Sequence, residues 1–186
     1  MSIIKIAIFL DRDGVVNEEV HLLHKPEDLK LIPRSAEAIA KLNQANIPVI
    51  LITNQPVVAR GLCTNEDINI IHNHLQKLLE QKNAKLDAIY YCPHHPNFTK
   101  ECECRKPLPG LILKAEKDFN INLTKSYMIG DRISDIKAGF LAGCKTIGVK
   151  TGYACDDGFK DATPDMMAND LYHAVEIILE RCKNDY

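Results

Sequence analysis

Short apolar runs alternate along this chain with segments whose apolar residues keep helical spacing, and this alternation constrains the fold more than any other feature. Apolar runs bounded by turn residues predict buried strands, and apolar positions three or four residues apart predict amphipathic helices. The predicted strands cover residues 3–10, 47–52, 86–91, 126–129 and 145–149, and the predicted helices cover residues 33–45, 65–81, 109–119, 133–142 and 169–182. Because parallel strands need helical crossovers, this order predicts an α/β fold with a doubly wound parallel sheet.

Length and charge limit the organisation of the chain and its partners. The 186 residues suffice for one core without disulfide support, so we expect a single domain over residues 1–182 and a tail over residues 183–186. A net charge of -2 gives no basic surface for nucleic acid, and no apolar run is long enough to span a membrane. The first residues lead straight into a predicted strand, without room for a signal peptide. We expect a cytoplasmic protein, and its short loops favour a monomer.

Acidic or other polar residues follow three of the predicted strands. Asp11-Arg12-Asp13-Gly14 follows the first strand, Thr53-Asn54-Gln55 the second, and Gly130-Asp131-Arg132 with Asp135 the fourth. The carboxyl ends of parallel strands meet at one edge of the sheet, where acids would raise each other's pKa unless a cation such as Mg²⁺ neutralised them. One carboxylate there can attack phosphorus, a second can move the proton, and Lys106 can bind phosphoryl oxygens. Each acid alone is equally well a helix cap or turn residue, but the combination favours phosphoryl chemistry.

A loop over residues 92–104 is rich in cysteine and histidine. Cys92 and His94 form one closely spaced pair, and Cys102 and Cys104 form another, with His95 to spare. Thiolate and imidazole in a closed set of four are the ligands of structural zinc, and such a set leaves no open position for catalysis. Because residue 105 follows directly, zinc would hold the adjoining basic residues at the mouth of the site. A cysteine group without metal is the alternative.

The motifs Asp11-x-Asp13-Gly14, Thr53, Lys106 and Gly130-Asp131-x-x-x-Asp135 resemble the four signature motifs of the haloacid dehalogenase (HAD) superfamily of phosphatases. The resemblance implies a Rossmann-like core in which Asp11 is the nucleophile and Asp13 is the general acid and base. It further implies that Thr53 and Lys106 bind the phosphoryl group. Mg²⁺ would be bound by Asp11, by Asp131 and by the backbone carbonyl of Asp13.

The zinc loop narrows the resemblance to a zinc-containing subgroup of this superfamily, whose members act on heptose 1,7-bisphosphate or on histidinol phosphate. Ala59-Arg60-Gly61 resembles the heptose enzymes, which implies hydrolysis of the C7 phosphate on the route to nucleotide-activated heptose for surface polysaccharide. Pro56-Val57-Val58 departs from the pattern of those enzymes. Histidinol-phosphate phosphatase is the alternative activity, and a catalytically silent zinc-binding scaffold is the alternative of another class.

Recognition of a sugar phosphate must come from loops around the site. Only 39 residues separate Asp13 from Thr53, and a core helix occupies part of them, so no large cap domain fits there. Loops then have to supply specificity. The residues expected to contact substrate, besides the phosphoryl ligands, are Asn54, Gln55, Arg60, Arg105 and Arg132, the arginines being suited to a phosphate that does not react. His72 is expected on a polar helix face.

Overall fold

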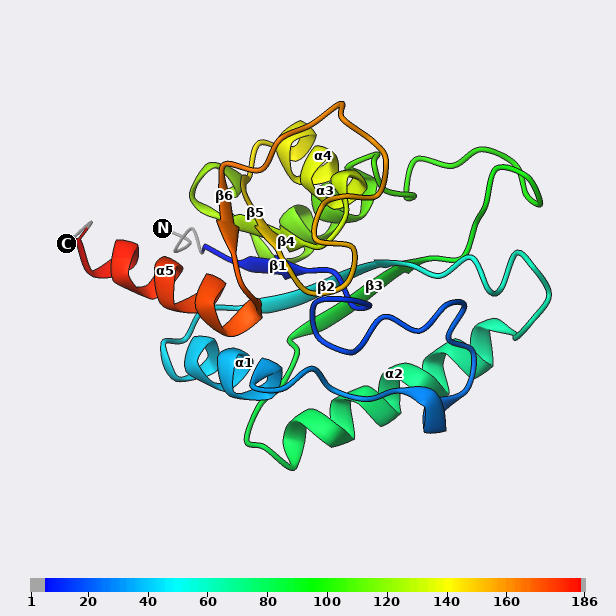
Figure 1. Cartoon of the computed structure of the whole chain (residues 1–186), viewed down its shortest axis with the longest axis horizontal. Coiled ribbons are helices and arrows are strands. Elements are labelled where there is room, and N and C mark those ends of the chain that lie inside the picture. The colour runs from blue at the N-terminus through cyan, green and yellow to red at the C-terminus, as the bar shows by residue number, and fades with distance from the viewer. Residues whose placement is uncertain (1–5, 185–186) are drawn as a thin grey trace.

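The computed structural model describes residues 6–184 and contains, within that range, a parallel sheet of six strands in the order β3-β2-β1-β4-β5-β6 (Figure 1). The strands are β1 (Ile8–Leu10), β2 (Val49–Asn54), β3 (Ala88–Cys92), β4 (Tyr127–Gly130), β5 (Lys145–Val149) and β6 (Met166–Ala168). The helices are α1 (Ser35–Gln44), α2 (Asn65–Glu80), α3 (Gly110–Phe119), α4 (Ile133–Ala142) and α5 (Leu171–Asn184), with short 3-10 helices η1 (Pro26–Asp28) and η2 (Leu123–Lys125). This arrangement confirms the predicted doubly wound α/β fold.

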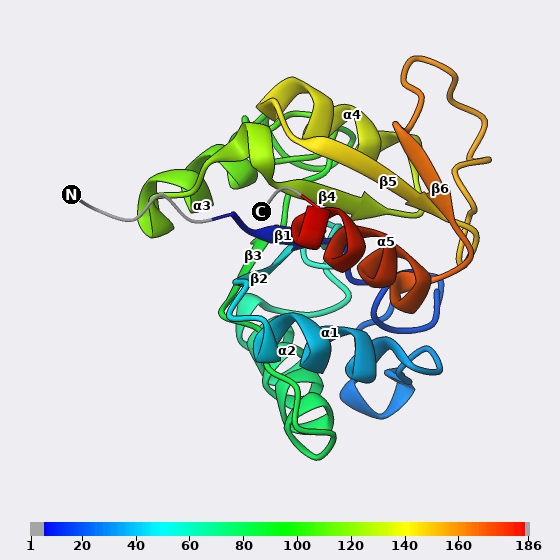
Figure 2. The same cartoon turned by 90° about the vertical axis from the view of Figure 1, so that its left-hand side faces the viewer.

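Helices cover both faces of the sheet: α3 and α4 lie on one face, and α1, α2 and α5 lie on the other (Figure 1, Figure 2). Successive strand residues point to opposite faces. Ile8 and Leu10 of β1 accordingly pack with residues of α1, α2 and α5, whereas Phe9 packs with residues of α3 and α4. A strand buried on both faces has to be apolar throughout, which explains why the strands read as continuous apolar runs.

The order in which successive strands are added to the sheet reverses at β1. Strands β2 and β3 lie on one side of β1, and β4, β5 and β6 lie on the other. Leu10 at the end of β1 is in register with Leu51 of β2 and with Ile129 of β4. The carboxyl ends of β1, β2 and β4 therefore lie side by side at the kind of switch point where open α/β sheets bind ligands.

Several elements differ from the sequence-based expectations; β2 and β3, for example, each begin two residues later than predicted. Strand β1 covers only Ile8–Leu10, and residues 3–5 of the predicted strand lie outside the described part of the chain. Strand β6 was not predicted, because its three residues at the edge of the sheet are too few to form an apolar run. Helix α5 continues to Asn184, two residues past the expected end of the last helix at residue 182, and Arg181 and Lys183 in its last turn favour the helix there.

The segment between β1 and β2 holds a loop, η1 and α1. Helix α1 packs against α5 and contributes to the core below the sheet. Within residues 6–184 this segment therefore forms no separate cap, as predicted. No helix in the same range is both long enough and apolar enough to cross a membrane.

The edge strand β6 is tied to β5 through Asp165. Its Oδ2 accepts hydrogen bonds from Thr146 N at 2.7 Å and from Thr146 Oγ1 at 2.9 Å. We predict that Asp165→Ala lowers the free energy of unfolding by about 1–3 kcal/mol, because the buried donors of Thr146 lose their acceptor. Urea unfolding followed by circular dichroism measures this change. Asp156→Ala, at an exposed position, should change it by less than about 0.5 kcal/mol, and equal losses in both variants would contradict the account.

Candidate active site

The acids that follow β1 and β4 meet at the switch point. Asp11 is fixed at the end of β1 by its backbone N–H, which donates to Ile129 O at 3.0 Å. Asp131 follows β4, and Asp135 lies in the first turn of α4, where its Oδ2 accepts from Arg132 N at 3.0 Å. Carboxylate oxygens of Asp11, Asp131 and Asp135 all lie within 4.8 Å of one another, and all three residues are buried. The structure thus brings together acids that are up to 124 positions apart in the sequence, from residue 11 to residue 135.

The ammonium group of Lys106 lies against these acids. Its Nζ is 2.7 Å from Asp11 Oδ1, 2.7 Å from Asp135 Oδ1 and 2.8 Å from Ile52 O. The side chain of Asn54 fixes the backbone from which Lys106 extends: Asn54 Nδ2 donates to Lys106 O, and Lys106 N donates to Asn54 Oδ1, both at 3.0 Å. Asn54 therefore positions the lysine, and its amide is already engaged within the protein.

The single positive charge of Lys106 does not neutralise the three acids of this cluster. Burial, reinforced by the neighbouring carboxylates, raises the pKa of Asp11 to about 7 and that of Asp131 to about 8. Burial alone would lower the pKa of Lys106, but Asp11 and Asp135 raise it above its usual value. Oδ1 of Asp131 is buried and has no hydrogen-bond partner among residues 6–184. A buried, unpartnered carboxylate oxygen beside two further acids is the donor set that fits Mg²⁺.

The side chain of Asp13 is held by three polar residues. Arg12 Nη2 lies 3.0 Å from Asp13 Oδ2, Asn17 Nδ2 donates to Asp13 Oδ1 at 2.9 Å, and Gln55 Nε2 donates to Asp13 Oδ2 at 3.1 Å. Burial by itself would raise the pKa of Asp13, but the Arg12 guanidinium and these hydrogen bonds hold it below its ordinary value. Gln55 Nε2 also donates to Thr53 Oγ1 at 2.9 Å, which leaves the Thr53 hydroxyl proton free to donate to a ligand.

Arg12 itself is fully buried, and His72 lies behind it. Arg12 Nη1 is 3.4 Å from His72 Nε2, and burial together with Arg12 lowers the pKa of His72 to about 3. The expectation that His72 lies on a polar helix face is therefore wrong: α2 turns this ring inward, and the ring stays neutral. A buried arginine as its neighbour explains why a polar residue is found on the inner face of the helix.

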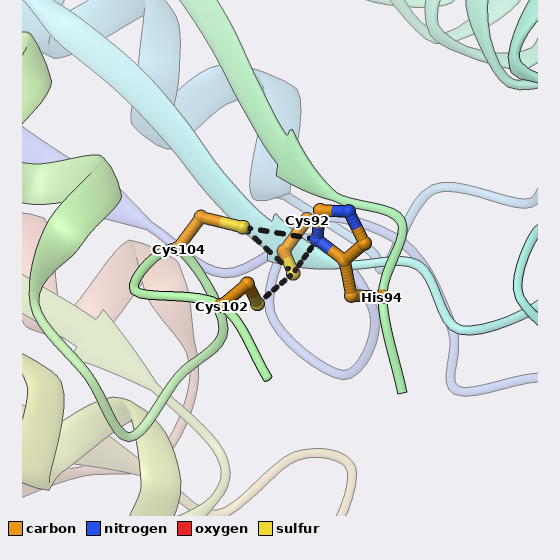
Figure 3. A group of neighbouring side chains, drawn as sticks. All are labelled: Cys92, His94, Cys102 and Cys104. Atoms are coloured by element: carbon orange, nitrogen blue, oxygen red, sulfur yellow. Dashed lines mark hydrogen bonds between the residues drawn. The ribbon is translucent and has the colours of Figure 1, made fainter. Parts of the chain in front are cut away.

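The loop over residues 92–104 brings together the four residues expected to bind zinc (Figure 3). Cys92 Sγ lies 3.6 Å from His94 Nδ1, 3.6 Å from Cys102 Sγ and 3.1 Å from Cys104 Sγ, and His94 Nδ1 lies 3.4 Å from Cys104 Sγ. All four ligand atoms lie within 4.8 Å of one another. Zn–S bonds of about 2.3 Å at tetrahedral angles would separate two sulfurs by about 3.8 Å, so the four atoms surround a space suited to zinc. His95 is outside this group, and its Nδ1 accepts from Asn97 N at 3.2 Å.

A cavity of about 480 Å³ opens above the acids. It is lined by every residue expected to contact substrate, namely Thr53, Asn54, Gln55, Arg60, Arg105, Lys106 and Arg132. The arginines are held by the protein: Arg60 lies 5.0 Å above the ring of Phe98, and Arg105 Nη1 donates to His94 O at 2.9 Å. Arg132 Cζ lies 3.5 Å from the ring centre of Tyr153, and Arg132 Nη2 lies 3.7 Å from Glu19 Oε2. Three cationic groups thus share the cavity with Lys106 and the acids.

Several contributors to the site were not predicted. Arg12 and Asn17 support Asp13, and Glu19 and Tyr153 hold Arg132. The role of Arg12 could have been identified from the sequence, because a cation between two acids in a buried turn has to be paired with one of them. The role of Tyr153 could not be identified from the sequence, because its contacts depend on a loop that returns to the site only in the folded chain.

Comparisons with known proteins agree with this geometry. The family model described as HAD-hydrolase-like matches residues 103–174. The D-glycero-beta-D-manno-heptose-1,7-bisphosphate 7-phosphatase of Yersinia pestis is 40% identical over 152 residues, which cover 78% of this chain and 81% of that protein. The D-glycero-D-manno-heptose-1,7-bisphosphate 7-phosphatase of Chlorobaculum tepidum is 37% identical over 183 residues, which cover 90% of this chain and 91% of that protein.

A solved structure has the same fold. The D,D-heptose 1,7-bisphosphate phosphatase from B. bronchiseptica, complexed with magnesium and phosphate, matches with a TM-score of 0.86 and 36% identity over 96% of this chain and 99% of that chain. The resemblance to HAD phosphatases that the motifs indicated is confirmed. This chain belongs to the D-glycero-D-manno-heptose-1,7-bisphosphate 7-phosphatase family of HAD-like hydrolases.

Proposed function

We propose that this protein is a Mg²⁺-dependent phosphatase that removes the C7 phosphate of D-glycero-D-manno-heptose 1,7-bisphosphate, in the biosynthesis of nucleotide-activated heptose. The observation that carries the proposal is the placement of Asp11, Asp131 and Lys106 at the switch point, under a cavity that also holds three arginines. The names of the relatives supply the substrate.

In the first step a carboxylate oxygen of Asp11 attacks phosphorus and forms an aspartyl phosphate, and the bond from phosphorus to the C7 oxygen breaks. The ammonium of Lys106 and the hydroxyl of Thr53 bind phosphoryl oxygens and stabilise their charge. Asp11, Asp131 and the backbone carbonyl of Asp13 would hold Mg²⁺, which would supply positive charge that keeps the acids ionised and neutralises the phosphoryl group.

Asp13 moves the proton in both steps. It gives its proton to the C7 oxygen as that oxygen leaves, because an alkoxide is far more basic than a carboxylate. In the second step the Asp13 carboxylate takes a proton from water, the water oxygen attacks phosphorus, and the bond to Asp11 breaks. Phosphate leaves, and Asp13 regains the proton it gave. The hydrogen bonds from Arg12, Asn17 and Gln55 favour the carboxylate form that this second step needs.

The phosphate that does not react needs cations of its own, and Arg60, Arg105 and Arg132 are the groups we assign to it. Asn54 and Gln55 act by positioning Lys106 and Asp13. An enclosing cap would be an alternative source of specificity, but residues 6–184 form none between β1 and β2.

We propose that Cys92, His94, Cys102 and Cys104 bind a structural Zn²⁺. The four ligands close the coordination sphere, so the ion would tie down a loop with little apolar content. Because Arg105 and Lys106 follow Cys104 directly, the ion would also fix two cations of the active site.

The remaining proposals concern the protein in the cell. Thiolate ligands persist where thiols are kept reduced, which supports a cytoplasmic location. The short loops of the chain favour a monomer, and we treat the sheet and its helices as one domain. A sugar phosphate is the proposed partner; nucleic acid and membranes are not.

We predict that heptose 1,7-bisphosphate is hydrolysed with a kcat/KM at least about tenfold above that of heptose 7-phosphate or histidinol phosphate. A charge-assisted contact to the second phosphate contributes about 1.5–3 kcal/mol, which corresponds to tenfold or more. Phosphate release from the three substrates measures the ratio. A preference for histidinol phosphate would overturn the proposed substrate while leaving the proposed chemistry intact.

We predict that Asp13→Asn lowers kcat by about 10²–10⁴-fold, because the amide can neither protonate the leaving group nor activate water. Steady-state kinetics measure the loss, and circular dichroism verifies the fold. Asp28→Asn, at an exposed position in η1, is the matched control and should keep full activity. An Asp13→Asn protein with wild-type kcat would rule out the role assigned to Asp13.

We predict that the purified protein carries roughly one zinc ion per chain and that Cys102→Ser loses it. The variant should unfold at a lower temperature and have a lower kcat/KM, because Arg105 and Lys106 lose their support. Elemental analysis by mass spectrometry and thermal unfolding measure both effects, with Cys63→Ser as the matched cysteine control. If Cys102→Ser kept its zinc, the ligand set would be wrong.

A further inference from the structure

The loop after β5, residues 151–155, crosses the active site and contacts both acidic turns. Thr151 Oγ1 donates to Gly14 O at 2.6 Å, which ties this loop to the turn that carries Asp11 and Asp13. Two residues on, Tyr153 N donates to Asp131 Oδ2 at 2.8 Å, and Cys155 N donates to Asp131 O at 2.6 Å. None of these contacts has a role in the proposed chemistry described above.

Close approach of this loop to Asp131 requires glycine on both sides of the carboxylate. A Cβ at Gly152 would lie 2.1 Å from Asp131 Oδ2, and a Cβ at Gly14 would lie 2.3 Å from the same oxygen. Both glycines have positive φ, +59° and +80°, which other residues rarely adopt. The Asp131 carboxylate is therefore enclosed between two backbone segments that leave its side chain little freedom.

The loop also keeps an unfavourable backbone conformation. Ala154 and Cys155 are in the left-handed region, with φ of 54° and 58°, although neither is glycine. Ala154 N donates to Thr151 O at 3.1 Å, and Asp156 N donates to Tyr153 O at 2.8 Å. Non-glycine residues persist in this conformation only where the surrounding contacts impose it, and such sites gather at functional positions.

These contacts divide the two oxygens of Asp131 between different tasks. Oδ2 accepts from Tyr153 N, whereas Oδ1 is buried without a hydrogen-bond partner among the described residues and is left for the cation. We propose that residues 151–155 are a positioning element for the Mg²⁺ ligand Asp131, anchored by the Thr151 hydroxyl, an inference that rests on the proposed Mg²⁺-dependent function. Hydrogen bonds that orient a metal ligand typically change metal affinity 10–100-fold when they are lost.

The test is direct measurement of Mg²⁺ binding to the full-length protein by isothermal titration calorimetry, without substrate. Thr151→Val keeps the shape of the side chain and removes the donor, so we expect a Kd for Mg²⁺ about 10–100-fold weaker than that of the wild type. Thr151→Ser restores the hydroxyl and should restore the affinity. A Thr151→Val protein that binds Mg²⁺ like the wild type would overturn the inference.

Two control variants separate positioning from general stabilisation. Ser126→Ala removes a buried hydroxyl that donates to Asn122 O at 2.6 Å, at the other end of β4, and should lower stability without changing Mg²⁺ affinity. Tyr153→Leu keeps the backbone N–H that holds Asp131, so its Mg²⁺ affinity should also stay unchanged, while KM rises because Arg132 loses the ring beneath it. Weaker Mg²⁺ binding by Ser126→Ala, equal to that of Thr151→Val, would show that the effect is only one of stability and would overturn the inference.

A second substitution covers the case in which Thr151→Val fails to fold. Gly152→Ala directs a methyl group at Asp131 Oδ2 and should weaken Mg²⁺ binding by displacing that carboxylate. Wild-type affinity in a folded Gly152→Ala protein would overturn the inference. If the wild-type protein itself bound no Mg²⁺, the proposed metal dependence would fail, a result distinct from failure of the inference alone.

Discussion

Repulsion between buried carboxylates at the ends of β1 and β4 is the constraint around which the site is arranged. Asp11, Asp131 and Asp135 lie within 4.8 Å of one another, and at such distances each ionised pair repels by about 3–4 kcal/mol in a partly polarisable protein environment. One ammonium, that of Lys106, offsets part of this repulsion by contacting two of the acids. The unpartnered oxygen of Asp131 marks where the remaining positive charge belongs.

Lys106 lies beside the acids on a loop that has few apolar residues of its own. The lysine is 95 positions from Asp11 in the sequence and reaches it only because the backbone around residue 106 is fixed. Asn54 at the end of β2 fixes one side through paired hydrogen bonds, and the cysteine and histidine cluster that ends at Cys104 fixes the other. The cysteine and histidine cluster and the acid cluster are therefore parts of one arrangement, in which the first helps to position Lys106 beside the second.

Much of this arrangement could be predicted from the sequence, because a helix or strand with a regular pattern of apolar residues can be recognised from that pattern. Helix α4 and strand β5 begin and end where the periodicity indicates, and the motif residues of the acids meet as expected. Strand β6 has too few residues to form a pattern; it pairs with β5, to which the preceding Asp165 is also hydrogen-bonded. His72 was misassigned because its environment is set by Arg12, a buried charge that composition places at the surface. The loop that holds Asp131 acts through backbone donors, which residue identity does not reveal.

The central claim, that Asp11 is the covalent nucleophile of a site organised by this charge balance, is tested most directly by identifying the phosphorylated residue. The wild-type protein can be mixed with heptose 1,7-bisphosphate, quenched with acid before the first turnover is complete and digested for peptide mass spectrometry. We expect a phosphoryl group on the peptide that contains Asp11, at the side chain of that residue. A phosphoryl group on any other residue would contradict the central claim.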